Sequence, residues 1–408
     1  MYETSVVIVG AGPVGCVAAY YLAQHGIDVI LAEQGSNCAQ DLRASTFHPP
    51  TLEMLDTLGL AEPLIEKGLK APVFHWRERE TGEAIAFDLA ELADETQFPF
   101  RIQCEQYHFA RMLAAELEET DNAKVLFNHR MLSYIEREDG IEVSLETPYA
   151  IEKVKADFLI GADGANSVVR KLLGVEFDGF TYPEKFLCLT TKEPLEAHLE
   201  NLALVNYVSD PEEWTVLLRV PSLWRVLVPA IAGESEKYLL SDAKKESVFG
   251  GLIGKPEVET HHRTIYSVHQ RVAQSFRKGR VCIIGDAAHL NNPLGGFGMN
   301  SGIHDAFSLC PKLVDILKNG ADAEELLSRF SAARRRQTHD FVQAQTKRNM
   351  AYLSVGEQSE HEMRKAQMKQ TRDDDDARRD YLLRQSMFES VREAAAEEER
   401  MTEERSAA

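Results

Sequence analysis

The 408-residue sequence has no apolar run long enough to cross a bilayer, so no membrane-spanning helix is predicted. The first predicted strand begins at Ser5, which leaves no room for a cleavable signal before it. Cysteine is scarce, and its six residues are scattered without a C-x-x-C pair, which favours buried thiols over disulfides or metal ligands. We therefore expect a cytoplasmic protein with no metal site and no membrane partner.

Positive charge is also in short supply. Lys and Arg number 45 against 65 Asp and Glu, which gives a formal net charge of −20. A nucleic acid is bound through basic residues that neutralise its phosphates, so this balance argues against a nucleic-acid partner. Much of the acidity lies late, in Asp373–Asp376 and Glu397–Glu404. We interpret the charged runs, including the basic run Arg334–Arg336, as solvated helix faces or turns.

The most informative stretch runs from Ser5 to Glu33. Ser5–Val9 is rich in β-branched residues and predicts a buried parallel strand, Val14–His25 has helical spacing, and Ile27–Ala32 predicts a second strand. The motif G-x-G-x-x-G at Gly10–Gly15 lies between the first strand and the helix. This order of strand, glycine motif, helix, strand and acid is typical of a dinucleotide site.

Each glycine of the motif has a mechanical role. Gly10 permits the tight turn, Gly12 lets a pyrophosphate approach the backbone, and Gly15 lets the helix pack closely on the strand. The helix N-terminus points N–H groups at the phosphates, and the final acid accepts hydrogen bonds from a ribose diol. We expect the adenine dinucleotide to contact Gly10, Gly12, Pro13, Gly15, Glu33 and Gln34.

Two later segments also run from a strand into a glycine-containing loop. Gly161–Ser167 carries Asp163-Gly164 before a basic helix start, a pattern that fits either a phosphate-facing loop or a structural turn. Gly279–His289 delivers Gly285-Asp286 at the end of a buried strand, the face where open α/β sheets bind ligands. Asn291–Asn300 then forms a bare-backbone cradle before a helix predicted over Ser301–Leu317, and its N–H groups can stabilise an anionic ring.

The remaining segments predict a second layer. Short alternating strands around Val73–Arg77 and over 180–266 indicate an antiparallel sheet, Arg101–Glu118 has helical periodicity, and Gly250–Gly254 is interpreted as a loop. We predict an α/β fold with a Rossmann-like nucleotide domain and an inserted antiparallel-sheet substrate domain. The nucleotide domain takes 1–72, 101–179 and 271–345, the sheet takes 73–100 and 180–270, and charged C-terminal helices take 346–408.

Together, Gly10–Gly15 with Glu33, Gly161–Arg170 and Gly285–Ala306 resemble the single-component FAD-dependent aromatic hydroxylases, the group typified by p-hydroxybenzoate hydroxylase. The three motifs lie in that family's order over residues 5–345. The resemblance implies that FAD is the dinucleotide, with NADH or NADPH as a transient co-substrate. No second G-x-G-x-x-G motif with its strand and helix exists for the nicotinamide cofactor.

The resemblance also implies roles for single residues. Arg43 would contact the FAD ribose or pyrophosphate, Gln106 the flavin moiety, and Asp163-Gly164 both FAD and the pyridine nucleotide. Asp286 would bind the ribityl chain or pyrophosphate. The remaining contacts would lie along the flavin ring, from Pro293, Gly296, Gly298, Met299 and Asn300. Phe297 departs from the family, because many relatives carry glutamine there, which leaves its effect on substrate choice open.

The implied reaction uses NAD(P)H and O2 to hydroxylate a small phenol or aromatic acid through a flavin C4a-hydroperoxide. Pro293 would line the reacting side of the flavin, and Arg225 is a candidate anchor for a substrate carboxylate. His48, His75 and Tyr207 are candidates to assist phenol deprotonation, although a structural role is the alternative for each. His289 is expected to be structural.

Other outcomes use the same scaffold. A reductase or dehydrogenase would use FAD without oxygen transfer, and an oxygenase of this fold can also carry out epoxidation or Baeyer–Villiger insertion. A flavin-binding regulatory or scaffold module is an alternative of another class, and a homodimer is left open. The chain is too short for the extra C-terminal domain of phenol-hydroxylase-like relatives, which mildly favours a smaller substrate.

Overall fold

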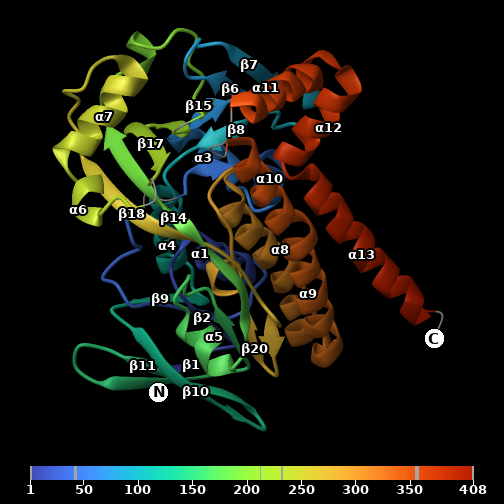
Figure 1. The fold of residues 1–408 in the computed structure, drawn as a ribbon. Coiled ribbons are helices and arrows are strands. Elements are labelled where there is room, and N and C mark those ends of the chain that lie inside the picture. The colour runs from blue at the N-terminus through green and yellow to red at the C-terminus, as the bar shows by residue number, and fades with distance from the viewer. Residues whose placement is uncertain (1, 41–43, 212, 231–232, 354–357, 407–408) are drawn as a thin grey trace.

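The computed structural model describes residues 2–40, 44–211, 213–230, 233–353 and 358–406. The predicted Arg43 contact therefore lies outside the described residues. Four sheets and the helices packed on them form the fold (Figure 1). No helix in these ranges is long and apolar enough to cross a membrane.

The central sheet is the predicted nucleotide-binding sheet. Its strand order is β19-β20-β13-β2-β3-β9, and the β2–β3, β2–β13, β3–β9 and β13–β20 pairs are parallel. Its strands are Val6–Val9 (β2), Val29–Glu33 (β3), Ala123–Phe127 (β9), Phe158–Gly161 (β13), Arg277–Lys278 (β19) and Val281–Ile283 (β20). Every residue of β2 and β13 is buried, as expected for apolar strands covered on both faces.

Two smaller sheets flank this core. A four-stranded sheet contains Tyr2–Glu3 (β1), Ile151–Ala156 (β12), Gly140–Glu146 (β11) and Arg130–Arg137 (β10). A three-stranded sheet contains Thr46–Phe47 (β4), Arg101–Gln103 (β8) and Leu69–Ala71 (β5). The helix predicted from Arg101 begins only at Gln106, because Arg101–Gln103 pairs with β4 and β5 as a strand.

The inserted sheet has eight strands in the order β21-β18-β14-β17-β16-β15-β6-β7. All neighbours are antiparallel except the parallel pair β15–β6. The strands are Val73–Glu78 (β6), Ala84–Asp88 (β7), Phe177–Thr191 (β14), Val205–Ser209 (β15), Thr215–Val220 (β16), Leu223–Pro229 (β17), His262–Ala273 (β18) and His289–Leu290 (β21). The α/β fold class with an inserted sheet is thus confirmed. The domain limits at 180 and 270 fall inside β14 and β18, and they stay a prediction.

Helices pack on the central parallel sheet and on the inserted sheet. Against the parallel sheet lie Pro13–Gln24 (α1), Gln106–Glu118 (α4), Val168–Leu173 (α5) and Phe297–Asn319 (α8). The shorter helices are Pro49–Asp56 (α2), Ala61–Lys67 (α3), Glu236–Leu239 (α6), Asp242–Ile253 (α7) and the single turns Leu89–Leu92, Leu195–Ala197 and Gly285–Ala287. The C-terminal part contains Ala323–Gln337 (α9), the π-helix Thr338–Gln343, Ala344–Leu353 (α10), Gln358–Asp373 (α11), Asp375–Gln385 (α12) and Phe388–Ser406 (α13).

The loop predicted over Gly250–Gly254 is wrong. Gly250 and Gly251 lie in the last turn of α7, and Gly254 ends that helix with a φ of 68°. Val248, Phe249 and Leu252 of this helix are buried against one face of the inserted sheet. Packing energy therefore offsets the low helix propensity of two glycines.

The C-terminal helices dock on the β6–β7 end of the inserted sheet (Figure 1). Leu382 and Leu383 of α12 and Met368 of α11 are buried with aromatic side chains of β6 and β7. Ion pairs rim this contact, including Lys365 with Glu78 at 2.6 Å and Arg379 with Asp94 at 2.7 Å. Some of the charged residues in this segment therefore form ion pairs that hold the helices on the sheet, and are not simply exposed to water.

Candidate functional site

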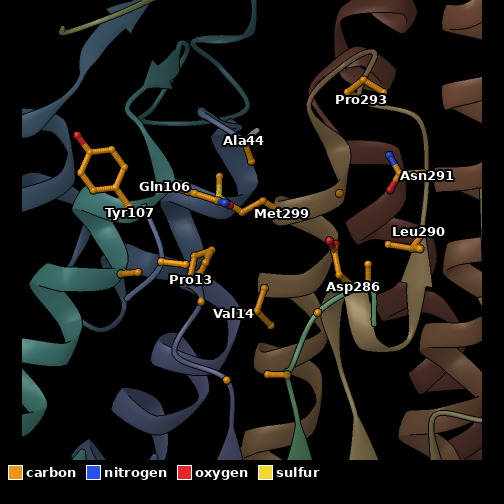
Figure 2. A pocket seen from close by; sticks show the side chains of 18 of the residues that line it. Pro13, Val14, Ala44, Gln106, Tyr107, Asp286, Leu290, Asn291, Pro293 and Met299 are labelled. Carbon is orange, nitrogen blue, oxygen red and sulfur yellow. The ribbon is translucent and has the colours of Figure 1, made fainter. Parts of the chain in front are cut away.

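A cavity of about 700 Å³ lies between the carboxyl ends of the parallel strands and the inserted sheet. Figure 2 shows side chains around it, with Pro13 and Val14 from α1, Gln106 and Tyr107 from α4, and Asp286 after β20. The loop before α8 and the start of that helix close another side. Of the predicted cofactor residues, the cavity is lined by Gly10, Gly12, Pro13, Glu33, Gln34, Gln106, Asp163, Gly164, Asp286, Pro293, Gly296, Gly298 and Met299.

The glycine motif has the geometry that its roles require. Gly10 has a φ of 105°, and a Cβ atom there would lie 2.4 Å from the Ala162 carbonyl oxygen. A Cβ atom on Gly15 would lie 2.0 Å from the Gly10 carbonyl oxygen, so this glycine permits close packing and is not on the cavity wall. A Cβ atom on Gly12 would meet nothing within 4 Å. The backbone at Gly12 is therefore open to a ligand.

Glu33 is held by the loop that it is expected to serve. Its Oε2 accepts a hydrogen bond from the Ala11 N–H at 2.9 Å, and its Oε1 accepts one from the Gly35 N–H at 2.8 Å. The carboxylate thereby ties the end of β3 to the glycine motif. The residue also lines the cavity, and each carboxylate oxygen can accept a second hydrogen bond, so a ribose hydroxyl can be bound as well.

The Asp163 carboxylate accepts hydrogen bonds from the N-terminus of helix α5. Its Oδ2 accepts hydrogen bonds from the N–H groups of Val168 at 2.7 Å and Val169 at 3.1 Å, and the Ser167 hydroxyl donates to its Oδ1. A carboxylate at a helix N-terminus is stabilised by the helix dipole. The two interpretations of this turn are thus compatible, because Asp163 both caps α5 and lines the cavity.

The loop that carries Asp286 is supported by a buried charge cluster. Asp305 Oδ2 accepts from the Gly285 N–H at 2.9 Å and contacts His289 Nε2 at 2.8 Å, while Arg334 Nε donates to Asp305 Oδ1 at 2.7 Å. Burial alone would raise the pKa of Asp305, but His289 and Arg334 hold that pKa below its usual value. The solvated interpretation of Arg334 is wrong, since its side chain is buried against Asp305.

The segment 291–300 forms a tight turn into α8. Gly295 and Gly296 have φ values of 102° and 73°, in the left-handed region that favours glycine. Asn300 is fully buried and faces the loop backbone, because its Nδ2 donates to the carbonyls of Thr46 at 2.8 Å and Gly296 at 2.7 Å. Asn300 is not among the residues that line the cavity, whereas Gly298 and Met299 are.

Buried amide side chains fix this turn from the other side. Asn292 Nδ2 donates to the Thr346 carbonyl at 2.9 Å, and Asn349 Nδ2 donates to the Leu294 carbonyl at 3.2 Å. Gln385 Nε2 of α12 then donates to Asn349 Oδ1 at 2.8 Å. The C-terminal helices thus reach the loop that faces the cavity. Sequence reasoning missed Asn349 and Gln385, because an amide in a charged helix gives no signal of burial.

The opposite wall belongs to the inserted sheet. Its lining is mixed, with the apolar side chains of Val216, Leu218 and Leu227 next to the polar side chains of Tyr207 and Arg225. Arg225 is 1% exposed, and its Nη1 donates to the Ser45 hydroxyl at 2.9 Å. A guanidinium therefore lies on the wall where a substrate is expected.

The structure places two predicted histidines off the cavity wall. His48 is fully buried, and its Nε2 donates to the Gly295 carbonyl at 2.7 Å, so Nδ1 is the nitrogen left to accept a proton. Burial lowers the pKa of His48 well below its usual value, and the charge of Arg101 lowers it further. Neither His48 nor His75 lines the cavity, and their part in proton transfer stays a prediction.

The residues present fit FAD. The cavity runs from the open backbone at Gly12, past the Glu33 carboxylate and the Asp286 loop, to the turn before α8. The starts of α1 and α8 have no side-chain cap, so their first N–H groups are available to the phosphates and to the electron-poor ring of such a cofactor. This order of groups matches the order of parts in the cofactor.

Comparisons with known proteins agree with this geometry. A family model described as an FAD binding domain matches residues 3–345. The chain is 30% identical over 383 residues to para-nitrophenol 4-monooxygenase of Pseudomonas sp. (strain WBC-3), covering 93% of this chain and 94% of the relative. It is 32% identical over 356 residues to 6-hydroxy-3-succinoylpyridine 3-monooxygenase of Pseudomonas putida (strain DSM 28022 / S16), covering 85% and 88%.

A solved structure is similar over almost the whole chain. The crystal structure of p-nitrophenol 4-monooxygenase from Pseudomonas putida DLL-E4 superposes with a TM-score of 0.90 at 28% identity, covering 96% of this chain and 99% of that one. The relatives are monooxygenases, which supports oxygen transfer over the reductase and scaffold interpretations. The chain belongs to the single-component FAD-dependent aromatic hydroxylases, and it is an FAD-dependent monooxygenase that hydroxylates an aromatic compound with NAD(P)H and O2.

Proposed function

We propose that the substrate is a small phenol, and that oxygen is inserted at the ring carbon para to the hydroxyl group where that carbon carries a leaving substituent. One observation carries this proposal. Two relatives that match most of the chain, para-nitrophenol 4-monooxygenase and 6-hydroxy-3-succinoylpyridine 3-monooxygenase, are named for positions that share this pattern. Carbon 4 of p-nitrophenol bears the nitro group, carbon 3 of 6-hydroxy-3-succinoylpyridine bears the succinoyl group, and each is para to a ring hydroxyl.

The cavity suits such a ligand. Val216, Leu218 and Leu227 offer apolar contact to an aromatic ring, while Tyr207 and Arg225 can orient its polar substituents. Pro293 lines the cavity from the loop before α8 and would lie along the reacting side of the flavin. The apolar side chains of this wall and Pro293 would also limit the access of water to the site of oxygen transfer.

Roles toward FAD follow from the positions of the residues. The N–H groups at Gly12 and in the first turn of α1 would bind the pyrophosphate, Glu33 would accept from the ribose, and Asp286 would hold the middle of the cofactor. Gln106 and the backbone of Gly298 and Met299 contact the flavin end. Bound FAD takes electrons from NAD(P)H and supplies the oxygen atom that is transferred.

The proposed reaction differs from simple hydroxylation in its products. With 4-nitrophenol, one NAD(P)H, one O2 and one proton would give benzoquinone, nitrous acid, water and NAD(P)+. The carbon–nitrogen bond breaks with its electron pair on the departing nitrite, and the ring loses its hydroxyl proton. A substrate with hydrogen at the para carbon would release no anion.

The test measures products with purified holoenzyme. We expect 4-nitrophenol to give NAD(P)H oxidised, O2 consumed and nitrite released in equal amounts. The control is 3-nitrophenol, which carries the same group at the wrong carbon and should release no nitrite. Hydroxylation of 4-nitrophenol without release of nitrite would overturn the proposal of a leaving substituent. The assignment of a phenol as the substrate would still stand. NAD(P)H oxidation that yields only hydrogen peroxide with both compounds would overturn the substrate class.

The cellular setting is proposed on separate grounds. All six cysteines are buried and free of disulfides, which supports a reducing compartment and hence the cytoplasm. The excess of acidic residues supports the absence of a nucleic-acid or membrane partner. A homodimer stays a prediction that sedimentation of the holoenzyme would check.

A further inference from the structure

Arg101 is a positive charge enclosed by the protein. It begins β8 and is 1% exposed, and its guanidinium carbon lies 4.3 Å from the centroid of the Phe74 ring. Its Nη2 donates to the Gln385 carbonyl at 3.1 Å. Its Nε and Nη1 have no hydrogen-bond partner among the described residues. Two of its donor nitrogens thus lack a well-placed acceptor among these residues, although the guanidinium lies near enough to the Tyr207 hydroxyl for that group to raise the pKa of Arg101.

The charge of Arg101 also lacks a counter-charge. Among the described residues, no carboxylate oxygen lies within the ion-pair distance of 4.0 Å from its nitrogens. The contrast is Arg334, which is also buried but whose Nε donates to Asp305 at 2.7 Å. A guanidinium stays protonated, and burying it without an anion is unfavourable. An uncompensated buried charge that the fold retains points to a ligand that completes it.

Tyr207 connects this charge to the cavity. Tyr207 lines the cavity, and its ring meets Phe74 edge-on with the centroids 6.4 Å apart. Arg101 stacks on the same Phe74 ring. Burial lowers the pKa of Arg101, and the hydroxyls of Tyr207 and Tyr381 oppose that effect through their interaction with the guanidinium. A ligand that bonds to Tyr207 is therefore one side chain away from the positive charge.

We propose that Arg101 is a positioning residue that acts through Tyr207 to favour the phenolate form of the bound substrate. This inference rests on the proposed function, because it assumes a phenol in the cavity. A phenolate ring is more electron-rich than the neutral phenol. Its negative charge would also act as the counter-charge that the buried Arg101 guanidinium lacks. Loss of the hydroxyl proton is also required if the product is a quinone.

The other titratable groups around Arg101 do not cancel its charge. His48, from the turn before α2, is neutral at physiological pH because burial lowers its pKa. Tyr381 of α12 is neutral because burial raises its pKa. Phe74 and Gln385 carry no charge, and Arg225, which lines the cavity as Tyr207 does, adds a second positive one. Two positive charges, those of Arg101 and Arg225, therefore lie close to Tyr207, with no neutralising carboxylate beside Arg101 in the described part of the chain.

The test uses 4-nitrophenol as its probe, because only the phenolate form of this compound is yellow. The oxidised full-length holoenzyme is titrated with pH in the absence of NAD(P)H, and difference spectra report the ionisation of the bound ligand. We expect wild type to bind the phenolate preferentially. Arg101→Gln should weaken that preference about tenfold, which is a rise of about one unit in the pKa of the bound phenol.

Three variants separate the outcomes. Arg101→Lys keeps the charge and should retain most of the preference, and Tyr207→Phe should lose it with Arg101 intact. Arg77→Gln is the matched control, since Arg77 is also a buried arginine, in β6 of the inserted sheet, and its guanidinium donates to the carbonyls of Asn201 and Glu200, off the cavity wall. An unchanged pKa of bound 4-nitrophenol in Arg101→Gln and Tyr207→Phe would overturn this inference alone. No binding by wild type would overturn the proposed substrate class, and this inference with it.

Discussion

Asn349 and Gly295 lie so close that a Cβ atom built on the glycine would be 2.7 Å from the Asn349 amide nitrogen. Gly295 also has a φ of 102°, which side chains rarely adopt. Two independent features of this turn therefore require glycine at position 295: its backbone conformation and the Asn349 amide packed against it. This turn carries Pro293 and ends in the first residues of α8.

Gly295→Ala should disturb the turn in both ways. Backbone strain costs about 1–3 kcal/mol, and the new methyl group displaces the Asn349 amide. We expect the share of NAD(P)H oxidation that yields hydroxylated product to fall about tenfold, with hydrogen peroxide in its place. Gly82→Ala is the control, since Gly82 has a φ of 69° but a Cβ atom there would meet nothing within 4 Å. If both variants converted the same share of oxidised NAD(P)H into hydroxylated product, the close contact between Gly295 and Asn349 would have no role in oxygen transfer.

Asn349→Ala tests the link between the C-terminal helices and the turn. The change removes the donor to the Leu294 carbonyl and leaves the Gln385 and Gln345 amides without their acceptor. An unsatisfied buried polar group costs about 1–3 kcal/mol, so urea unfolding should show a loss of that size. We also expect more hydrogen peroxide per NAD(P)H, because the turn is no longer held.

The control for that variant is Asn206→Ala. Asn206 of β15 is also fully buried, but its amide bonds to the Ala203 backbone and to His75, and among the described residues it makes no hydrogen bond to the turn before α8. Asn206→Ala should lower the free energy of unfolding without changing the amount of hydroxylated product formed per NAD(P)H oxidised. If Asn349→Ala lost only stability in the same way, Asn349 would have a structural role and no role in positioning the turn.

Glu33→Gln should weaken FAD binding. The carboxylate accepts charge-assisted hydrogen bonds from Ala11 and Gly35, and an amide offers one acceptor oxygen in place of two. Loss of a charged hydrogen bond is worth about 1.5–3 kcal/mol, so the dissociation constant of FAD should rise at least about tenfold. Ultrafiltration of the variant with added FAD measures it. Glu236→Gln, which breaks a surface pair with Lys185, should bind FAD like wild type; equal affinity in Glu33→Gln would contradict the role.

Much of the nucleotide fold could be predicted because its signals are local. Gly10–Gly15, the helix after it and Glu33 all lie within one continuous βαβ unit, where spacing alone fixes their relation. Helix limits were less accurate, since α8 begins at Phe297 and not at Ser301. The strand at Arg101–Gln103 was missed because its pairing partners, β4 and β5, lie far back in the chain.

The substrate end was harder to predict for the same reason. Arg101 and Gln385 are joined by a hydrogen bond across 284 positions, and Asn349 meets Leu294 across 55. No periodicity links such residues. Burial is equally hidden, because Arg334 is one of three consecutive arginines and only the fold shows that it turns inward toward Asp305. Charge in a helix predicts exposure unless a partner is known.

The pH dependence of stability should come in part from His304. This residue is buried, and its Nε2 contacts the Thr51 hydroxyl at 2.9 Å. Burial lowers the pKa of His304 to about 3, with a further lowering by Arg334 that Asp305 opposes. The folded protein therefore keeps this ring neutral at a pH where the unfolded chain protonates it.

The sign follows from that difference. Below a pH of about 6.5 the unfolded chain binds a proton that the folded protein does not, so the free energy of unfolding falls with falling pH by about 1.4 kcal/mol per unit. The loss continues until the pH reaches the folded pKa of about 3. Between pH 6.5 and pH 5 this amounts to about 2 kcal/mol. His304→Gln cannot titrate, so urea unfolding with saturating FAD should show a loss about 2 kcal/mol smaller than in wild type. Equal losses in the two proteins would mean that His304 is protonated in the folded state, which its enclosure by Thr51 and Arg334 makes unfavourable.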